Sequence, residues 1–167
     1  GSNSTRGINA GGNATGGATN IIDYVTIASA GNATDFGDLL GAKQYLTTVQ
    51  NSTRLVIVGG YASDVIQYVT ISSTGNATDF GDLTQARGSL AGASSSTRGV
   101  VAGGNSSSTV VNVIEYITIA STGNSTDFGD LTIVKEFPPA VSSGTRAVWG
   151  SGSDVSNVMD YITIVST

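Results

Sequence analysis

The sequence predicts an all-β fold made of four repeated units, and three observations support this prediction. An Arg preceded by Thr recurs at intervals of 48, 44 and 48 residues, and a Tyr recurs at intervals of 44, 48 and 45. Between these markers lie short runs rich in β-branched and aromatic residues, separated by Gly, Ser and Asn, as in strands joined by turns. A period of this length is typical of supersecondary units that stack side by side. The markers are Arg6, Arg54, Arg98 and Arg146, and Tyr24, Tyr68, Tyr116 and Tyr161.

Each full unit is expected to supply about four strands, and the unit that ends at Asp130 contains all four segments. They read, in order, LTQARGSLAGASSS, TRGVVAGG, NVIEYITIASTGN and STDFGD. The second is an apolar run that stops at a Gly pair, and the third is rich in Val, Ile and Tyr, as expected of short buried strands. A single repeat domain over 1–167 therefore contains four units, approximately 1–39, 40–83, 84–131 and 132–167.

The sequence begins and ends inside a unit. The first unit begins at its second strand, which contains Arg6, and so lacks its first strand. The last unit lacks its fourth strand, because Asp-Phe-Gly-Asp-Leu occurs only at 35–39, 79–83 and 127–131. Neither end supplies the strand that the other lacks, and exposed strand edges readily pair with another chain. We therefore expect a neighbouring copy to fill the gap, or units to stack end to end into a fibre. The alternative is that the chain is a piece of a longer repeat protein.

The units alternate in length. The Gly pair and the following Tyr are 12, 8, 12 and 9 residues apart, and the difference lies in Asn13–Asn20 and Asn105–Asn112. These two loops are expected to protrude from the same face of alternate units, either as a functional pair or as neutral variation in loop length.

The repeated charges predict a structural role. The remaining basic residues also recur, at intervals of 44 and 48, and acidic pairs recur beside Gly. Charges that occur once per unit are expected to pair at the same place in every unit and to fix its register. Carboxylate pairs can alternatively bind Ca²⁺, but these pairs lack the dense acidic loop of a strong site. The residues are Lys43, Arg87 and Lys135, and Asp35, Asp38, Asp79, Asp82, Asp127 and Asp130.

The composition argues against several classes of function. The net charge is -5 and no Lys/Arg cluster exists, so a nucleic-acid-binding surface is not expected. The sequence contains neither His nor Cys, which removes the commonest general base and metal ligands. No apolar run has the length of a membrane span. We expect no enzymatic activity, no cofactor and no structural metal.

Seven Asn residues lie in Asn-x-Ser/Thr triplets, the acceptor pattern for N-glycosylation in secreted proteins. Three of them occupy one repeat position, where an Asn side chain commonly caps a turn. Both interpretations remain open from the sequence. The residues are Asn3, Asn13, Asn32, Asn51, Asn76, Asn105 and Asn124.

The last unit departs from the repeat at Phe137, Pro138-Pro139 and Trp149. Exposed aromatic side chains beside a stiff turn would form a sugar-stacking or partner-docking surface, with Trp149 as the candidate ligand contact. Terminal repeats are, however, commonly atypical because they cap the array, and a capping role is the alternative.

The order of markers resembles the kelch repeat. The matching residues in one unit are Arg87, Gly103-Gly104, Glu115-Tyr116, Phe128 and Leu131, with counterparts in the other units. Kelch repeats usually carry Trp where this chain has Phe, and Gln67 replaces the acidic residue before Tyr68. The resemblance implies a β-propeller with one four-stranded blade per repeat. The string Thr-Asp-Phe-Gly-Asp-Leu-Thr-x-Ala-Arg also resembles repeats in tail-fibre-like and surface proteins of phages and bacteria, which implies an extracellular or virion-surface location.

These observations predict a non-enzymatic structural protein of an extracellular fibre or phage tail fibre, which assembles with further copies of itself through strand edges. The alternative is an adhesion module that binds carbohydrate on a cell or virion surface, through the two long loops and Trp149.

Overall fold

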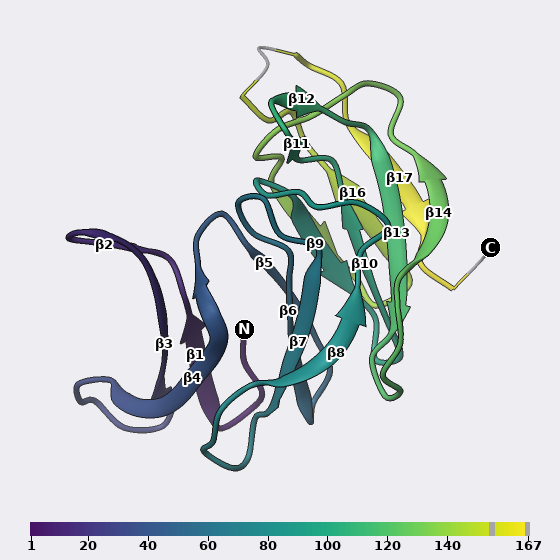
Figure 1. Ribbon diagram of the computed structural model, residues 1–167. Helices are drawn as coiled ribbons and strands as arrows, with labels where there is room; N and C mark the ends of the chain where they lie inside the picture. Colours follow the sequence, from purple (N-terminus) through teal and green to yellow (C-terminus); the bar gives the residue numbers. More distant parts are fainter. Residues whose placement is uncertain (154–155, 166–167) are drawn as a thin grey trace.

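The computed structural model describes residues 1–153 and 156–165, and all of its regular elements are strands. They form four antiparallel sheets, numbered here in chain order, and one small hairpin (Figure 1). Sheet 1 contains β1 (Arg6–Ala10), β2 (Asn13–Ala14), β3 (Gly17–Thr26) and β4 (Thr34–Lys43), and sheet 2 contains β5 (Thr47–Gln50), β6 (Arg54–Val58), β7 (Val65–Thr70) and β8 (Thr78–Asp82). Sheet 3 contains β9 (Ala91–Ser94), β10 (Arg98–Ala102), β13 (Val113–Thr118) and β14 (Thr126–Asp130), and sheet 4 contains β15 (Ala140–Ser142), β16 (Arg146–Trp149) and β17 (Asp160–Thr163). The hairpin is β11 (Asn105–Ser106) with β12 (Thr109–Val110). The expected all-β class is thus confirmed.

Apart from the short hairpin strands, each sheet is a meander in which successive strands lie side by side. Sheet 2 has the order β5-β6-β7-β8, and sheet 3 has the order β9-β10-β13-β14. Sheet 1 has β1, β3 and β4 in the places of the last three strands, and β2 extends β3 as a hairpin. Sheet 4 has only β15, β16 and β17, the places of the first three. The strand content of the four sheets matches the order expected from the sequence.

The first strand of each sheet lies later in its segment than expected. In LTQARGSLAGASSS the strand is Ala91–Ser94, whereas Arg87 lies in the connection that precedes it. In sheet 1 the chain start occupies part of the place that the sequence left empty. Ser2 forms a bridge with Gly7, and Gly1 and Ile8 exchange two backbone hydrogen bonds. Two residues therefore pair with β1 in the register that Gln50 has with Leu55 in sheet 2.

The fourth strand carries a β-bulge in every sheet that has one. Gly37, Gly81 and Gly129 adopt φ values of 145, 147 and 135°, and the register of the partner strand shifts at the same place. Only Gly adopts such φ values without strain. The bulge is therefore the physical reason for the Gly in each Asp-Phe-Gly-Asp segment.

The hydrophobic core consists of three apolar layers, one between each pair of successive sheets. The layer between sheets 1 and 2 contains Ile22, Phe36, Leu55 and Ile71. The layer between sheets 2 and 3 contains Val49, Ile66, Phe80 and Ile117, and the layer between sheets 3 and 4 contains Val100, Ile114, Trp149 and Ile164. Each large apolar side chain buried in this way contributes about 1.5–3 kcal/mol. Sheets 2 and 3 are covered on both faces, and sheets 1 and 4 on one.

Candidate assembly interface

The Thr-Arg arginines join each sheet to the next. The guanidinium of Arg54 lies 4.3 Å from the ring centroid of Tyr68 in its own sheet, and its Nη1 donates to the backbone oxygen of Ile119 in sheet 3 at 3.1 Å. The other Thr-Arg residues stack in the same way, at 4.3 to 4.6 Å. Two of them repeat the hydrogen bond, from Arg6 to Ile71 and from Arg98 to Ile164.

The expected pairing of these arginines with the repeated Asp residues is therefore wrong. The reason is geometric. The guanidinium that stacks on the Tyr ring donates to a carbonyl oxygen of the following sheet. The acidic side chains lie elsewhere, exposed on the fourth strands. A planar guanidinium suits this double role, because it can stack and donate at the same time.

The fourth strand makes a second junction with the sheet that follows. In sheet 1 the oxygens of Phe36 and Asp38 accept hydrogen bonds from Gly75 and Ala77 at 2.7 and 2.8 Å. The amide of Asp38 donates to Oδ1 of Asn76 at 3.0 Å. Sheets 2 and 3 repeat this arrangement, with Phe80 and Asp82 bonded to Gly123, Asn124 and Ser125. The junction uses the backbone of the Asp residues and leaves their carboxylates at the surface.

The acidic pairs do not build a metal site within the described residues, where no group of three or more potential ligands is found. Their carboxylates also form no ion pair in that part of the chain. These side chains are Asp35, Asp38, Asp79, Asp82, Asp127 and Asp130, all exposed.

Two of the other repeated cations form buried ion pairs with the acid that precedes the repeated Tyr. Arg87 pairs with Glu115, and both side chains are fully buried. Arg87 also donates to the oxygens of Gly103 and Val113 at 2.8 and 2.9 Å. Burial lowers the pKa of Arg87, while the charge and the hydrogen bond of Glu115 oppose this. The pair ties the connection before sheet 3 to its third strand.

The pair in sheet 4 has the same form. Nζ of Lys135 lies 2.9 Å from Oδ2 of Asp160, and the other carboxylate oxygen accepts from the amide and hydroxyl of Thr132. Burial by itself would raise the pKa of Asp160. The hydrogen bonds from Lys135 and Thr132 and the charge of Lys135 outweigh that effect, so its pKa lies below the ordinary value.

Sheet 2 departs from this pattern because Gln67 occupies the acidic position. Lys43 donates instead to Oγ of Ser63, and burial lowers its pKa, opposed by the charge of Asp64. Gln67 is fully buried, and its Oε1 accepts from the amide of Leu40. Its Nε2 has no hydrogen-bond partner among the described residues. The sequence showed the acidic residue before Tyr, but the spacing alone did not reveal that it is the partner of the cation.

The arginine bridge has an unmatched half on the outer face of sheet 4 and another on the outer face of sheet 1, within the described residues. Arg146 stacks on Tyr161, but no carbonyl oxygen among the described residues accepts from its side chain. At the other end, the oxygen of Ile27 occupies the place of the acceptors Ile71 and Ile119, and no donor in the described ranges reaches it. The fourth-strand junction, in contrast, is not repeated between sheets 3 and 4 within the described residues: an added Cβ at Gly129 in sheet 3 meets nothing within 4 Å, whereas at Gly81 in sheet 2 it would meet the backbone of Gly123.

Apolar side chains on the outer faces of sheets 1 and 4 are exposed, whereas their counterparts between successive sheets are buried. On the outer face of sheet 1, Val25 and Ile27 are 40% and 54% exposed, whereas their counterparts Val69 and Ile71 in sheet 2 are 3% and 0% exposed. On the outer face of sheet 4, Val141 and Met159 are 67% and 69% exposed, against 1% and 0% for Val49 and Ile66. Tyr161 of that face is also exposed. We call these the sheet 1 face (Val25, Ile27) and the sheet 4 face (Val141, Met159, Tyr161).

The candidate glycosylation sites occupy three kinds of turn. Oδ1 of Asn3 and Asn51 accepts backbone hydrogen bonds from the next residues and closes the turn before the Arg strand. Asn76 and Asn124 cap the fourth strand of the preceding sheet, and Asn32 has the same position at the open sheet 1 end. Asn13 and Asn105 begin the two extra hairpins, at β2 and β11. Side-chain hydrogen bonds therefore give five of these residues, all but Asn13 and Asn32, a structural role in the chain itself.

The ligand contact expected at Trp149 is not one that this side chain can make. Trp149 is fully buried between sheets 3 and 4, and its Nε1 donates to the oxygen of Ala91 at 3.3 Å. An apolar ring of this size fills the layer beside the small residues Ala91 and Ala93, which the sequence alone did not show.

Comparison with known protein families finds no family that matches this chain, and a search of curated proteins finds no relative. In the described part of the chain no helix is long and apolar enough to cross a lipid bilayer.

Proposed function

We propose that this protein is a non-enzymatic structural repeat protein that assembles head to tail, with the sheet 4 face of one copy packed on the sheet 1 face of the next. The observation that carries the proposal is the contrast in exposure at equivalent positions. Side chains that are buried between successive sheets inside the chain are uncovered at both ends. The two faces are complementary because they are the two halves of one contact that the chain already makes three times.

The contact between copies would repeat the internal one. Arg146 would donate to the oxygen of Ile27 of the next copy, as Arg6, Arg54 and Arg98 do within the chain. Val25 and Ile27 would pack against Val141, Met159 and Tyr161.

We also propose that the four sheets are blades of a kelch-like propeller or propeller-like array. The meander order of each sheet and the face-to-face packing of successive sheets support this arrangement. A head-to-tail contact closes into a ring when its rotation permits and otherwise continues as a filament. The proposed location, outside the cell or on a virion, rests on the resemblance of the repeat string to tail-fibre-like proteins.

The test is a complementation experiment between two blocked variants. Ile27→Asp places a charge on the sheet 1 face, and Met159→Asp places one on the sheet 4 face. Multi-angle light scattering should show that the natural chain grows in mass with concentration, while each variant alone remains a monomer. An equimolar mixture should form a dimer and stop, since the two unmodified faces pair with each other and both remaining faces carry the Asp substitution. Ser121→Asp, in an exposed turn, is the matched control and should assemble like the natural chain.

Added salt should strengthen assembly, because each copy carries a net charge of -5 and the copies repel one another at low ionic strength. A natural chain that stays monomeric at all concentrations and salt levels would refute the proposal. If either blocked variant alone forms dimers, the contact between copies is symmetric and not head to tail.

A further inference from the structure

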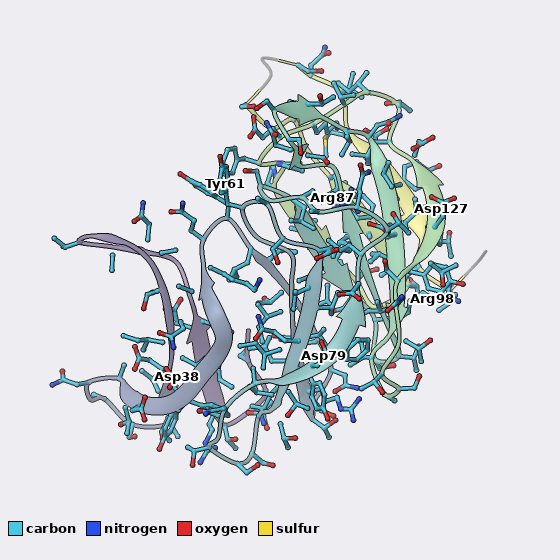
Figure 2. All side chains as sticks on the ribbon, in the orientation of Figure 1. Asp38, Tyr61, Asp79, Arg87, Arg98 and Asp127 are labelled. Atoms are coloured by element: carbon cyan, nitrogen blue, oxygen red, sulfur yellow. The ribbon has the colours of Figure 1, made fainter. Side chains whose placement is uncertain are left out.

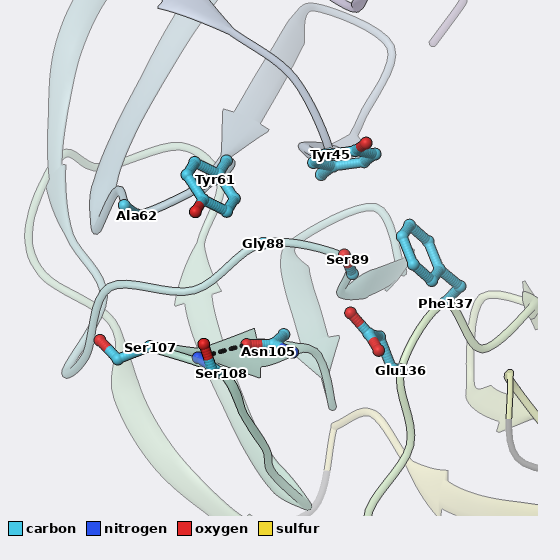
Figure 3. A pocket seen from close by; sticks show the side chains of 10 residues that line it. All are labelled: Tyr45, Tyr61, Ala62, Gly88, Ser89, Asn105, Ser107, Ser108, Glu136 and Phe137. Atoms are coloured by element: carbon cyan, nitrogen blue, oxygen red, sulfur yellow. Dashed lines mark hydrogen bonds between the residues drawn. The ribbon is translucent and has the colours of Figure 1, made fainter.

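All six non-Gly residues with positive φ in the described part of the chain line one cavity of about 520 Å³ (Figure 3). Side chains in this region of backbone space are strained, and such residues gather where a structure holds a ligand site in a fixed geometry. The residues are Tyr45, Ala62, Ser89, Ser107, Ser108 and Phe137. None of them belongs to the two end faces described above.

The repeat builds the backbone of this cavity. Tyr45, Ser89 and Phe137 each lie two residues after a repeated cation, with φ of 60, 59 and 53°. The amide of Ser89 donates to the oxygen of Tyr45 at 2.8 Å, and the amide of Phe137 donates to the oxygen of Ser89 at 2.8 Å. One backbone position therefore connects sheets 2, 3 and 4 in a row beneath the cavity.

A second row of backbone bonds brings in the residues that follow the Gly pairs. Tyr61 donates to the oxygen of Gln44 at 2.9 Å, and Asn105 donates to that of Gly88 at 2.8 Å. The side chains on this repeated frame differ from unit to unit, as Tyr, Ser and Phe in the first row and as Tyr and Asn in the second. Residues that maintain the fold recur in this chain, so side chains that vary on a constant frame are free to serve a ligand.

The long hairpin of sheet 3 adds hydroxyl groups. Ser107 and Ser108 form the two-residue turn between β11 and β12, with φ of 49 and 72°, as a type I′ turn requires. Oδ1 of Asn105 accepts from the amide of Ser108 at 2.9 Å, which leaves the Nδ2 group of Asn105 as a donor. In sheet 1 the corresponding hairpin turns at Thr15-Gly16, so the strained Ser pair is particular to the hairpin at the cavity.

The cavity combines apolar rings with neutral polar groups and one carboxylate. Tyr45 and Phe137 are exposed and meet edge to face, with centroids 5.7 Å apart, and Tyr61 is 73% exposed. Among the described residues, Glu136 is the charged residue of the lining, and no described Lys or Arg belongs to it. Glu136 is partly buried, and its carboxylate forms no hydrogen bond or ion pair within the described residues.

We propose that this cavity, which we call the aromatic cavity, binds a neutral saccharide. The C–H groups on one face of a pyranose ring carry partial positive charge and pack on the negative face of an aromatic ring. The Glu136 carboxylate and the Ser and Asn groups can accept from and donate to sugar hydroxyls. Its volume lies in the range of small-ligand sites, about 300–1,000 Å³.

Two other ligand classes fit less well. Anionic ligands face the uncompensated charge of Glu136, with no basic residue in the described part of the lining. An organic cation would need rings that enclose it, whereas Tyr61 is largely open to solvent and Tyr45 and Phe137 turn toward each other.

The test uses the full chain and a panel of neutral tetrasaccharides: cellotetraose, maltotetraose, mannotetraose and chitotetraose. At least one should shift the amide NMR signals of Tyr61, Asn105 and Phe137, with affinity measured by calorimetry. Tyr61→Ala should weaken binding at least tenfold, Tyr61→Phe should keep it within about twofold, and Glu136→Gln should weaken it at least fivefold. Tyr161→Ala, which removes an exposed Tyr of the sheet 4 face, should leave it unchanged.

The natural chain and every variant should keep the same circular-dichroism spectrum, so that lost binding reports on the cavity and not on folding. If no tetrasaccharide shifts these signals, or if tetramethylammonium binds there and the sugars do not, the proposal is overturned. Assembly measured by light scattering should be the same for Tyr61→Ala as for the natural chain, which separates this site from the assembly interface.

Discussion

The repeated Arg acts as a bridge between sheets. Its guanidinium is planar, so one face can rest on the Tyr ring of its own sheet while an N–H group reaches a carbonyl oxygen of the next. A Lys at the same position would present a single ammonium on a flexible stem, which can do either task but not both with good geometry. This explains why the position carries Arg in all four units, whereas the other repeated cation is Lys twice and Arg once.

Arg54 and Arg146 provide a matched pair for testing the bridge. Both stack on a Tyr ring, but of the two, within the described residues, Arg54 alone has a carbonyl acceptor in a neighbouring sheet. Arg54→Ala should lower the free energy of unfolding by about 1–3 kcal/mol, and Arg54→Lys should recover only part of the loss. Arg146→Ala should cost about 0.5 kcal/mol or less in the monomer. Urea denaturation at a concentration below assembly measures each value, and equal losses would refute the bridge.

The lowered pKa of Asp160 predicts that the protein loses stability in acid. Its folded-state pKa is depressed, so it contributes stability that is fully present above its unfolded pKa of about 3.9 and is lost as the pH falls through the lower folded value. Asp160→Asn leaves the buried Lys135 without its counter-ion and should cost about 3 kcal/mol at neutral pH. Thermal melts from pH 7 to pH 2 should show a smaller acid-induced drop in the variant. An unchanged acid slope would show that Asp160 does not carry this dependence.

The residue scale is also where prediction from sequence is least complete. The repeat spacing predicted that the charges are structural, but it paired Arg with Asp of the Asp-Phe-Gly-Asp segment. In the structure Arg87 pairs with Glu115, and Lys135 pairs with Asp160. The spacing of the repeat shows which residues recur. The ion-pair partner of each residue depends on the twist and pleat of the strands, which decide the face of the sheet that each side chain occupies.

At the scale of the element, the fourth strand depends on its bulge. Gly81 lies where this strand meets the next sheet, and a Cβ there would collide with the backbone of Gly123. Gly129 has a similar φ but open space around it. The two positions therefore separate the cost of backbone strain from the cost of the junction between sheets.

Gly81→Ala and Gly129→Ala should both destabilise the protein, because Ala is strained at these φ values. Gly81→Ala should cost about 1–3 kcal/mol more, because the sheets must separate to admit the methyl group. Chemical denaturation of the two variants measures the difference. Equal losses would mean that the junction between Phe80 and Gly123 contributes little to stability.

The strands themselves were readable from the sequence because apolar runs, Gly pairs and Asn turns recur with a fixed spacing. The first strand of each unit was harder to predict. In sheet 3, for example, this strand is Ala91–Ser94, which consists of small residues with weak β propensity. Its position depends on pairing with β10. The aromatic cavity was also hidden, although Phe137 was noted as a departure from the repeat, because its residues come from connections far apart in the sequence.

At the scale of the whole molecule, stability is shared among three layers arranged in chain order. Figure 2 shows side chains between the successive sheets, and the three apolar clusters each join only neighbouring sheets. Stacked repeats of this kind behave as a nearly one-dimensional array, in which each unit is stabilised by its neighbours. Sheets 2 and 3 have a neighbour on each face, whereas sheets 1 and 4 have one neighbour, so the ends should open more easily than the middle.

Hydrogen exchange should reveal this gradient. In dilute monomer, amides of β6, β7, β10 and β13 should exchange more slowly than those of β1, β3, β16 and β17, because opening an end sheet exposes one layer and opening a middle sheet exposes two. When the concentration is raised until copies assemble, the end strands should gain protection while the middle strands change little. A double variant, Ile27→Asp with Met159→Asp, should keep the gradient and lose its concentration dependence. Uniform protection across the four sheets in the dilute monomer would contradict the layered account, and protection that rises in the middle strands instead of the ends would contradict the proposed contact between copies.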